Sequence, residues 1–68
     1  MLLQQLKDAE ARVEISRDNV TRQRRIVTEL RALGGELSTA QALLRSLEGM
    51  LEAREAQRDR LKKLIELA

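Results

Sequence analysis

The feature that most restricts the fold of this chain is a heptad repeat that runs along nearly its whole length. Small and apolar residues recur at alternating steps of four and three positions, which places them in one stripe along an α-helix. The first stripe consists of Leu2, Leu6, Ala9, Val13, Ser16, Val20, Gln23, Val27 and Leu30. The second consists of Ala40, Leu44, Leu47, Leu51, Arg54, Arg58, Leu61, Ile65 and Ala68. These stripes, called the seam below, predict two helices that each bury one edge.

The break between the stripes holds two of the three glycines in the chain. Gly34 or Gly35 can adopt the left-handed conformation that ends a helix, because neither has a Cβ to clash. Arg31 suits the negative end of the helix dipole in the last turn before them. After the glycines, Ser38 and Gln41 have the spacing of a capping box, in which the hydroxyl accepts a hydrogen bond from the backbone three residues on.

We therefore predict a single domain over residues 1–68. A first helix covers about residues 2–33, a turn follows at Gly34-Gly35, and a second helix covers about residues 39–67.

Folding the chain back at Gly35 aligns the two stripes layer by layer, from Leu30 opposite Ala40 to Leu2 opposite Ala68. In this register one flank of the seam brings opposite charges together and produces no like-charge contact. The expected ion pairs are Glu10 with Lys62, Arg17 with Glu55, and Arg24 with Glu48. Exposed pairs contribute only about 0–1 kcal/mol each, so they indicate register more than stability. The predicted fold is all-α, an antiparallel two-helix hairpin packed like a coiled coil.

The other flank is apolar near the turn, and one hairpin cannot bury it together with the seam. Removing a Leu-sized side chain from water contributes about 1.5–3 kcal/mol, so leaving several exposed is costly for a chain this small. A second copy docked on this face would form a four-helix bundle with two-fold symmetry. The expected interface residues are Ile26, Leu33, Leu37, Leu43, Leu47, Met50 and Leu64. We expect a homo-oligomer, with a dimer favoured, and an unidentified protein on the same face is the alternative.

A polar layer interrupts the seam at Ser16, Arg54 and Arg58. Two inward arginines could bind an anion or a partner carboxylate. They could also extend past the seam to solvent and only fix the register, as polar groups at core positions often do. The second interpretation is the one we favour.

The composition leaves little material for catalysis. The chain contains no Cys, no His and no Tyr, which removes the commonest nucleophiles, general bases and metal ligands. The glycine pair lacks the Lys and the hydroxyl of a phosphate-binding P-loop. We expect no enzymatic activity, no catalytic or metal-binding residues and no cofactor. The N-terminal apolar run is too short for a signal peptide or a membrane span, so we expect a cytoplasmic protein that does not contact membranes.

The basic stretch "RDNVTRQRRIV" is the main argument for nucleic acid. The register above pairs Arg17 and Arg24 with carboxylates, which leaves Arg22, Arg25 and Arg31 as possible phosphate contacts. The chain has no aromatic residue on which a base could stack, and a net charge of +2 is small. Nucleic-acid binding is therefore the less favoured hypothesis.

The segments "RQRRIVTEL", "TAQALLRSLEGM" and "RDRLKKL" resemble a group of short, uncharacterised bacterial proteins, most often alphaproteobacterial. The matching residues are Arg22, Gln23, Arg24, Ile26, Val27, Glu29, Leu30, Thr39, Leu43, Leu44, Glu48, Met50 and residues 58–61. The turn departs from that group, whose members tend to carry Gly-x-Asp where this chain has Gly-Gly-Glu-Leu-Ser. The resemblance implies a helical hairpin from a bacterial cytoplasm, and it implies no activity.

Together these patterns indicate a non-enzymatic, self-associating interaction or scaffold module. The alternative function is a small dimeric RNA-binding protein that uses the basic face of the first helix.

Overall fold

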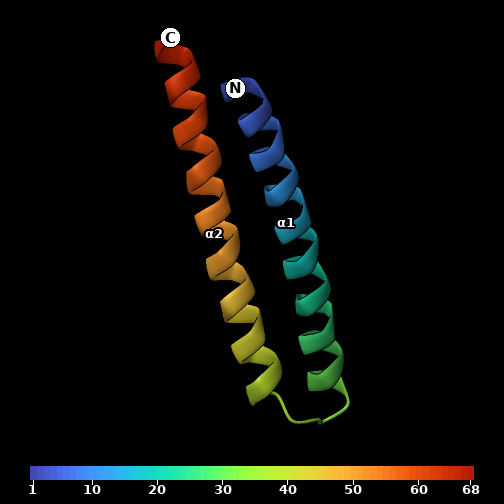
Figure 1. Ribbon diagram of the computed structural model, residues 1–68. Coiled ribbons are helices and arrows are strands. Elements are labelled where there is room, and N and C mark those ends of the chain that lie inside the picture. Colours follow the sequence, from blue (N-terminus) through green and yellow to red (C-terminus); the bar gives the residue numbers. More distant parts are fainter.

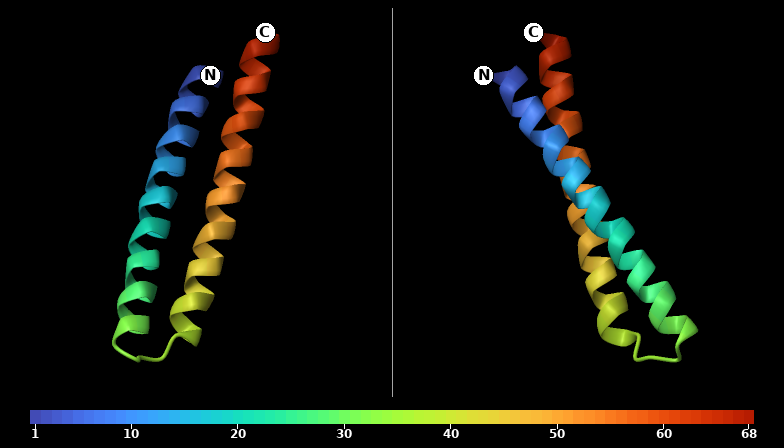
Figure 2. Two further views of the ribbon diagram at one scale, coloured as in Figure 1. Left: turned by 180° about the vertical axis from the view of Figure 1, so that it is seen from behind. Right: turned by 90° about the vertical axis from the view of Figure 1, so that its right-hand side faces the viewer.

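The two halves of the repeat form two long helices in a computed structural model that describes all residues 1–68. Helix α1 spans Leu2–Ala32 and helix α2 spans Ser38–Leu67. They run antiparallel and side by side, with both chain ends at the same end of the molecule (Figures 1 and 2). The result is a rod of 53 × 14 × 13 Å. The prediction of an all-α helical hairpin is confirmed.

The buried residues of α1 follow the heptad stripe without exception. They are Ala9, Val13, Ser16, Val20, Gln23 and Val27, and they are the only buried residues in the molecule. Leu6 and Leu30, one step further along the stripe at either end, are half-buried. The period of the sequence therefore identifies the face of α1 that packs against α2.

The two sides of the seam differ in the size of their residues. The buried residues of α1 are small or β-branched apart from Gln23, whereas α2 contributes mainly Leu, Ile and Arg. The seam positions of α2 from Ala40 to Ile65 are half-buried, and no residue of α2 is fully buried. Long side chains of α2 thus cover the short side chains of α1, and their own outer surfaces remain in solvent.

Gln23 is the one amide among these buried residues, and its polar atoms need a partner. Its Nε2 donates a hydrogen bond of 3.0 Å to the backbone carbonyl oxygen of Ala40. No buried side-chain nitrogen or oxygen lacks a hydrogen-bond partner. The sequence placed Gln23 opposite Leu47 in the seam, and the structure shows that its amide reaches toward the turn.

The turn ends α1 with a Schellman motif. Gly35 N–H donates to Leu30 C=O at 2.8 Å, Gly34 N–H donates to Arg31 C=O at 3.3 Å, and Gly34 has a φ of +73°. This combination of bonds requires a left-handed residue at Gly34, and glycine adopts that conformation without steric cost. Gly35 is restricted in another way, because a Cβ there would lie 3.1 Å from Leu30 Cδ2.

The capping box predicted at Ser38 and Gln41 is wrong. Helix α2 begins at Ser38, after Leu37, and no side chain of the expected cap bonds to its backbone. Glu36 takes that role, because its carboxylate accepts hydrogen bonds from both the backbone N–H and the hydroxyl of Ser38. Gln41 contributes only its backbone N–H, which donates to Leu37 C=O at 2.8 Å. A carboxylate next to a helix N-terminus also interacts favourably with the helix dipole.

Replacement of Gly34 tests the turn. Gly34→Ala should lower the free energy of unfolding by about 1 kcal/mol, because the new Cβ is strained at positive φ. Gly34→Asn should cost less, since Asn tolerates the left-handed region better than other residues. Thermal unfolding followed by circular dichroism measures both variants. Equal stability of all three proteins would contradict a required left-handed residue at this position.

Candidate functional site

The seam leaves two flanks of the hairpin open to solvent, and their chemistry differs. The charged flank carries Arg17 and Arg24 of α1 beside Glu55 and Glu48 of α2. The apolar flank, on the opposite side of the seam, carries Ile26 of α1 and, from α2, Leu43, Met50 and Leu64. These flanks are the candidate functional surfaces of the molecule.

On the charged flank the structure brings together two of the three expected ion pairs. Arg17 Nη2 lies 3.4 Å from Glu55 Oε2, and Arg24 Nη2 lies 3.2 Å from Glu48 Oε2. Glu10 and Lys62 form no ion pair. The two pairs that form lie one heptad apart on each helix, so both fit one antiparallel register.

The apolar flank leaves large side chains in water. The exposed fractions are 39% for Ile26, 49% for Leu43, 48% for Met50 and 52% for Leu64. Leu33, at the turn, is 83% exposed, whereas Leu37 and Leu47 are half-buried. Leu47 belongs to the seam stripe, so part of its surface already packs against α1. Of the seven residues expected at an interface, five are therefore exposed and two are partly covered within the hairpin.

The polar layer in the seam lies where the stripe predicts it. Ser16 is buried, and Arg54 and Arg58 are half-buried. Arg58 Nε donates to Asp59 Oδ1 at 3.0 Å, so its guanidinium already has a carboxylate partner on its own helix. The Arg58 side chain therefore extends from the seam to a polar group at its edge, in agreement with the interpretation that these arginines reach past the seam.

Three further arginines, Arg22, Arg25 and Arg31, are exposed and take part in no ion pair. Arg22 and Arg25 lie about one helical turn apart on α1, and Arg31 lies in its last turn. They are available to a phosphate, although no aromatic side chain accompanies them.

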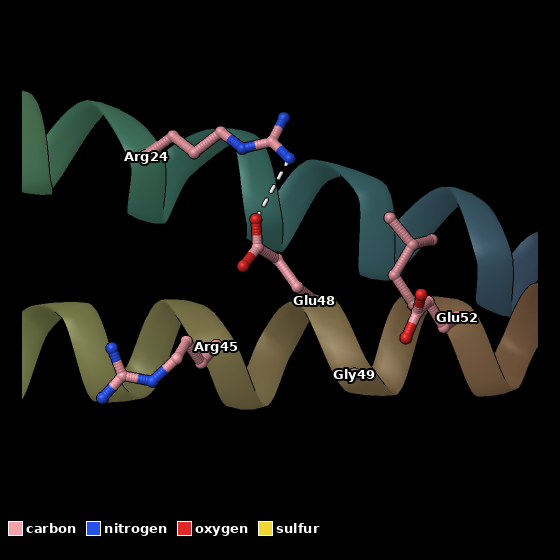
Figure 3. Close-up of a pocket in the computed structure, with 6 residues that line it drawn as sticks. Arg24, Arg45, Glu48, Gly49 and Glu52 are labelled. Carbon is pink, nitrogen blue, oxygen red and sulfur yellow. Dashed lines mark hydrogen bonds and ion pairs between the residues drawn. The ribbon is translucent and has the colours of Figure 1, made fainter.

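A shallow hollow of about 480 Å³ opens on the charged flank (Figure 3). Its lining residues are Arg24, Arg45, Glu48, Gly49, Leu51 and Glu52. The bond between Arg24 and Glu48 crosses it, and the Arg45 guanidinium points away from that pair. Two positive and two negative side chains line the hollow, so it has no net charge that would attract a small ion. No group of three or more acidic, His or Cys residues is placed to hold a metal ion, and neither helix has a segment long and apolar enough to cross a membrane.

Glu36 is the residue that sequence reasoning missed in the turn. The pKa of the Glu36 carboxyl lies below its usual value of 4.5. The main cause is the hydrogen bond donated by the Ser38 hydroxyl, and the hydrogen bond donated by the Ser38 backbone N–H has a smaller effect in the same direction. A carboxyl with a lowered folded-state pKa stabilises the fold above its unfolded pKa, and that contribution is lost as the pH falls through the folded pKa. The signal in the sequence was an acidic residue two positions before the first residue of a helix that has no other cap.

The pKa of Glu36 gives a direct test of this bond. Ser38→Ala removes the hydroxyl donor, so the pKa of the Glu36 carboxyl should rise toward 4.5. Carboxyl-carbon NMR over a pH titration measures the shift. An unchanged pKa in the variant would rule out the hydroxyl as the main cause.

The charged flank is tested by a double-mutant cycle. Arg17→Glu should lower the free energy of unfolding by about 0.5–1 kcal/mol, because it sets two carboxylates side by side. Adding Glu55→Arg should restore part of the loss. The matched control is the same cycle on Glu10 and Lys62, which form no ion pair and should show no coupling. Coupling of equal size in both cycles would argue against the register shown by the structure.

No protein-family model matches the sequence, and no curated protein or solved structure is similar to it. The resemblance to short bacterial hairpin proteins therefore stays a prediction. The surfaces of the hairpin itself are what indicate a function.

Proposed function

We propose that this hairpin is a non-enzymatic, self-associating scaffold module, and that two copies dock through their apolar flanks to form a four-helix bundle. The observation that carries the proposal is the distribution of burial. Only six of 68 residues are buried, all of them on α1, while large apolar side chains of both helices remain exposed.

The exposed apolar side chains of the flank are larger than the apolar side chains of the core. The four apolar residues of the core are three Val and one Ala, whereas the exposed residues of the apolar flank are Ile, Leu and Met. Completing the burial of each half-exposed side chain contributes about 1 kcal/mol or more. A small domain has only about 5–15 kcal/mol of net stability, so a second copy that covers this flank changes stability substantially.

The remaining parts of the proposal come from the sequence. The absence of Cys, His and Tyr supports a role without catalysis. The resemblance to short bacterial hairpins supports a location in a bacterial cytoplasm. Dimer formation with a different protein on the same flank would require a partner with an apolar helical face.

A second candidate function, RNA binding, is supported by the exposure of Arg22, Arg25 and Arg31 and by their lack of carboxylate partners. Such binding would weaken steeply with salt, since each phosphate contact releases counterions. The lack of aromatic residues makes it the weaker candidate.

Light scattering after gel filtration tests the association. The native chain should elute at twice its mass of 7.8 kDa. Leu43→Lys combined with Met50→Lys should give a folded monomer, because both residues lie outside the seam and their charges would be buried in the dimer. Ile15→Lys is the matched control, since Ile15 is 61% exposed and lies outside both flanks.

A native chain that stays monomeric and helical at high micromolar concentration would overturn the proposal. Retention of the dimer in the double variant would place the interface elsewhere on the molecule.

A further inference from the structure

Gly49 lies in the middle of α2, where glycine destabilises a helix relative to alanine. The other two glycines have a reason within the chain, since Gly34 has positive φ and Gly35 lies against Leu30. Gly49 has neither, because a Cβ added there would meet no atom within 4 Å. The packing of the hairpin therefore does not require a glycine at this position.

Gly49 belongs to a second stripe on α2, which we call the outer stripe. It steps by four and three residues like the seam, but on the other side of the helix, and its residues are all exposed. Its members are Ala42, Ser46, Gly49, Ala53 and Ala56. Short side chains allow the backbones of two helices to approach closely.

Charged residues border the outer stripe on one side and apolar residues on the other. Arg45 and Glu52 lie on either side of Gly49 along α2 (Figure 3), and both are exposed and in no ion pair. They are two helical turns apart, about 10 Å along the axis, so they cannot pair with each other. Leu43 and Met50 border the opposite side and belong to the apolar flank.

This pattern is complementary to itself in one orientation. If a second α2 lies antiparallel with a two-fold axis at Gly49, Arg45 faces the partner's Glu52 and Glu52 faces the partner's Arg45. The same axis places Ser46 opposite the partner's Ala53 and Met50 opposite the partner's Met50. A parallel pair in register would instead set Arg45 against the partner's Met50 and Glu52 against the partner's Gln57, so neither charge would have an opposite charge beside it.

We propose that the occupant of the outer stripe is a second copy of this chain, whose α2 packs antiparallel across Gly49 with two reciprocal Arg45–Glu52 ion pairs. The inference rests on the proposed self-association and centres the contact on the outer stripe, with the apolar flanks of the two copies along one side of it. Leu43 and Met50 lie at the edge of the contact, so it also covers part of the apolar flank.

Disulfide trapping tests the orientation of the two α2 helices. The chain contains no Cys, so no native thiol competes with the introduced ones. Ser46→Cys and Ala53→Cys are prepared separately, mixed in equal amounts, exchanged by unfolding and refolding, and oxidised. The antiparallel pairing places these two positions within the Cα separation that a disulfide requires. The mixed disulfide should therefore exceed its random share, as measured by mass spectrometry.

Replacing Gly49 tests the close approach. Gly49→Gln should raise the dimer dissociation constant at least about tenfold in sedimentation equilibrium, because the added side chain separates the two backbones. The matched control is Ala11→Gln, which adds the same side chain to an exposed position of α1 and should leave the constant unchanged.

The outcomes separate the geometry from the association itself. A native dimer that gives no excess of mixed disulfide, or that tolerates Gly49→Gln, overturns the antiparallel contact and leaves the scaffold proposal standing. An excess of the disulfide between two Ser46→Cys chains indicates a parallel pair and also overturns the antiparallel contact. A native chain that is monomeric at every concentration overturns both proposals.

Discussion

The seam between α1 and α2 is the one tertiary contact of this molecule, and both helices depend on it. Helices in water are cooperative but only marginally stable without packing partners, so about thirty residues on each side need the burial that the other helix provides. Ala9, Val13, Val20 and Val27 supply that burial on α1. Because a single row of small residues forms the core, anything that shifts the register exposes the whole row at once.

The two flanks of the seam differ in chemistry, because one carries ion pairs between the helices and the other carries exposed apolar side chains. The ion pairs of Arg17 and Arg24 lie on one side and fit a single register, and a charged, well-hydrated surface has no need of a further partner. The apolar flank lies on the other side and stays open. Because one flank has its charges paired and the other leaves apolar side chains exposed, association is favoured on the apolar side, which is why we place the second copy on the side of α2 that carries Leu43 and Met50.

The repeat in the sequence predicted the helices, the face that α1 buries and the register of two ion pairs, because periodicity depends on backbone geometry alone. The repeat did not predict the contacts of side chains that can form hydrogen bonds or ion pairs with several different partners. The cap at Ser38 was wrong because the Ser38 hydroxyl and backbone N–H both donate to the Glu36 carboxylate two residues earlier, and Gln41 N–H donates to Leu37 C=O instead. The contact of Gln23 with Ala40 was not foreseen, since a flexible amide can reach along the seam as well as across it. Glu10 and Lys62 lie toward the open end, where Leu2 is 39% exposed and little packing holds long side chains in place.

The difference in residue size across the seam also bears on which chains pair with which. Two α1 stripes placed together would leave cavities between short side chains, and two α2 stripes would crowd Leu against Leu while burying two pairs of arginines. Only an α1 stripe against an α2 stripe fills the space. The Schellman turn holds these two unlike stripes on the same chain at very short range, so copies can meet through their outer surfaces without exchanging the helices of their cores.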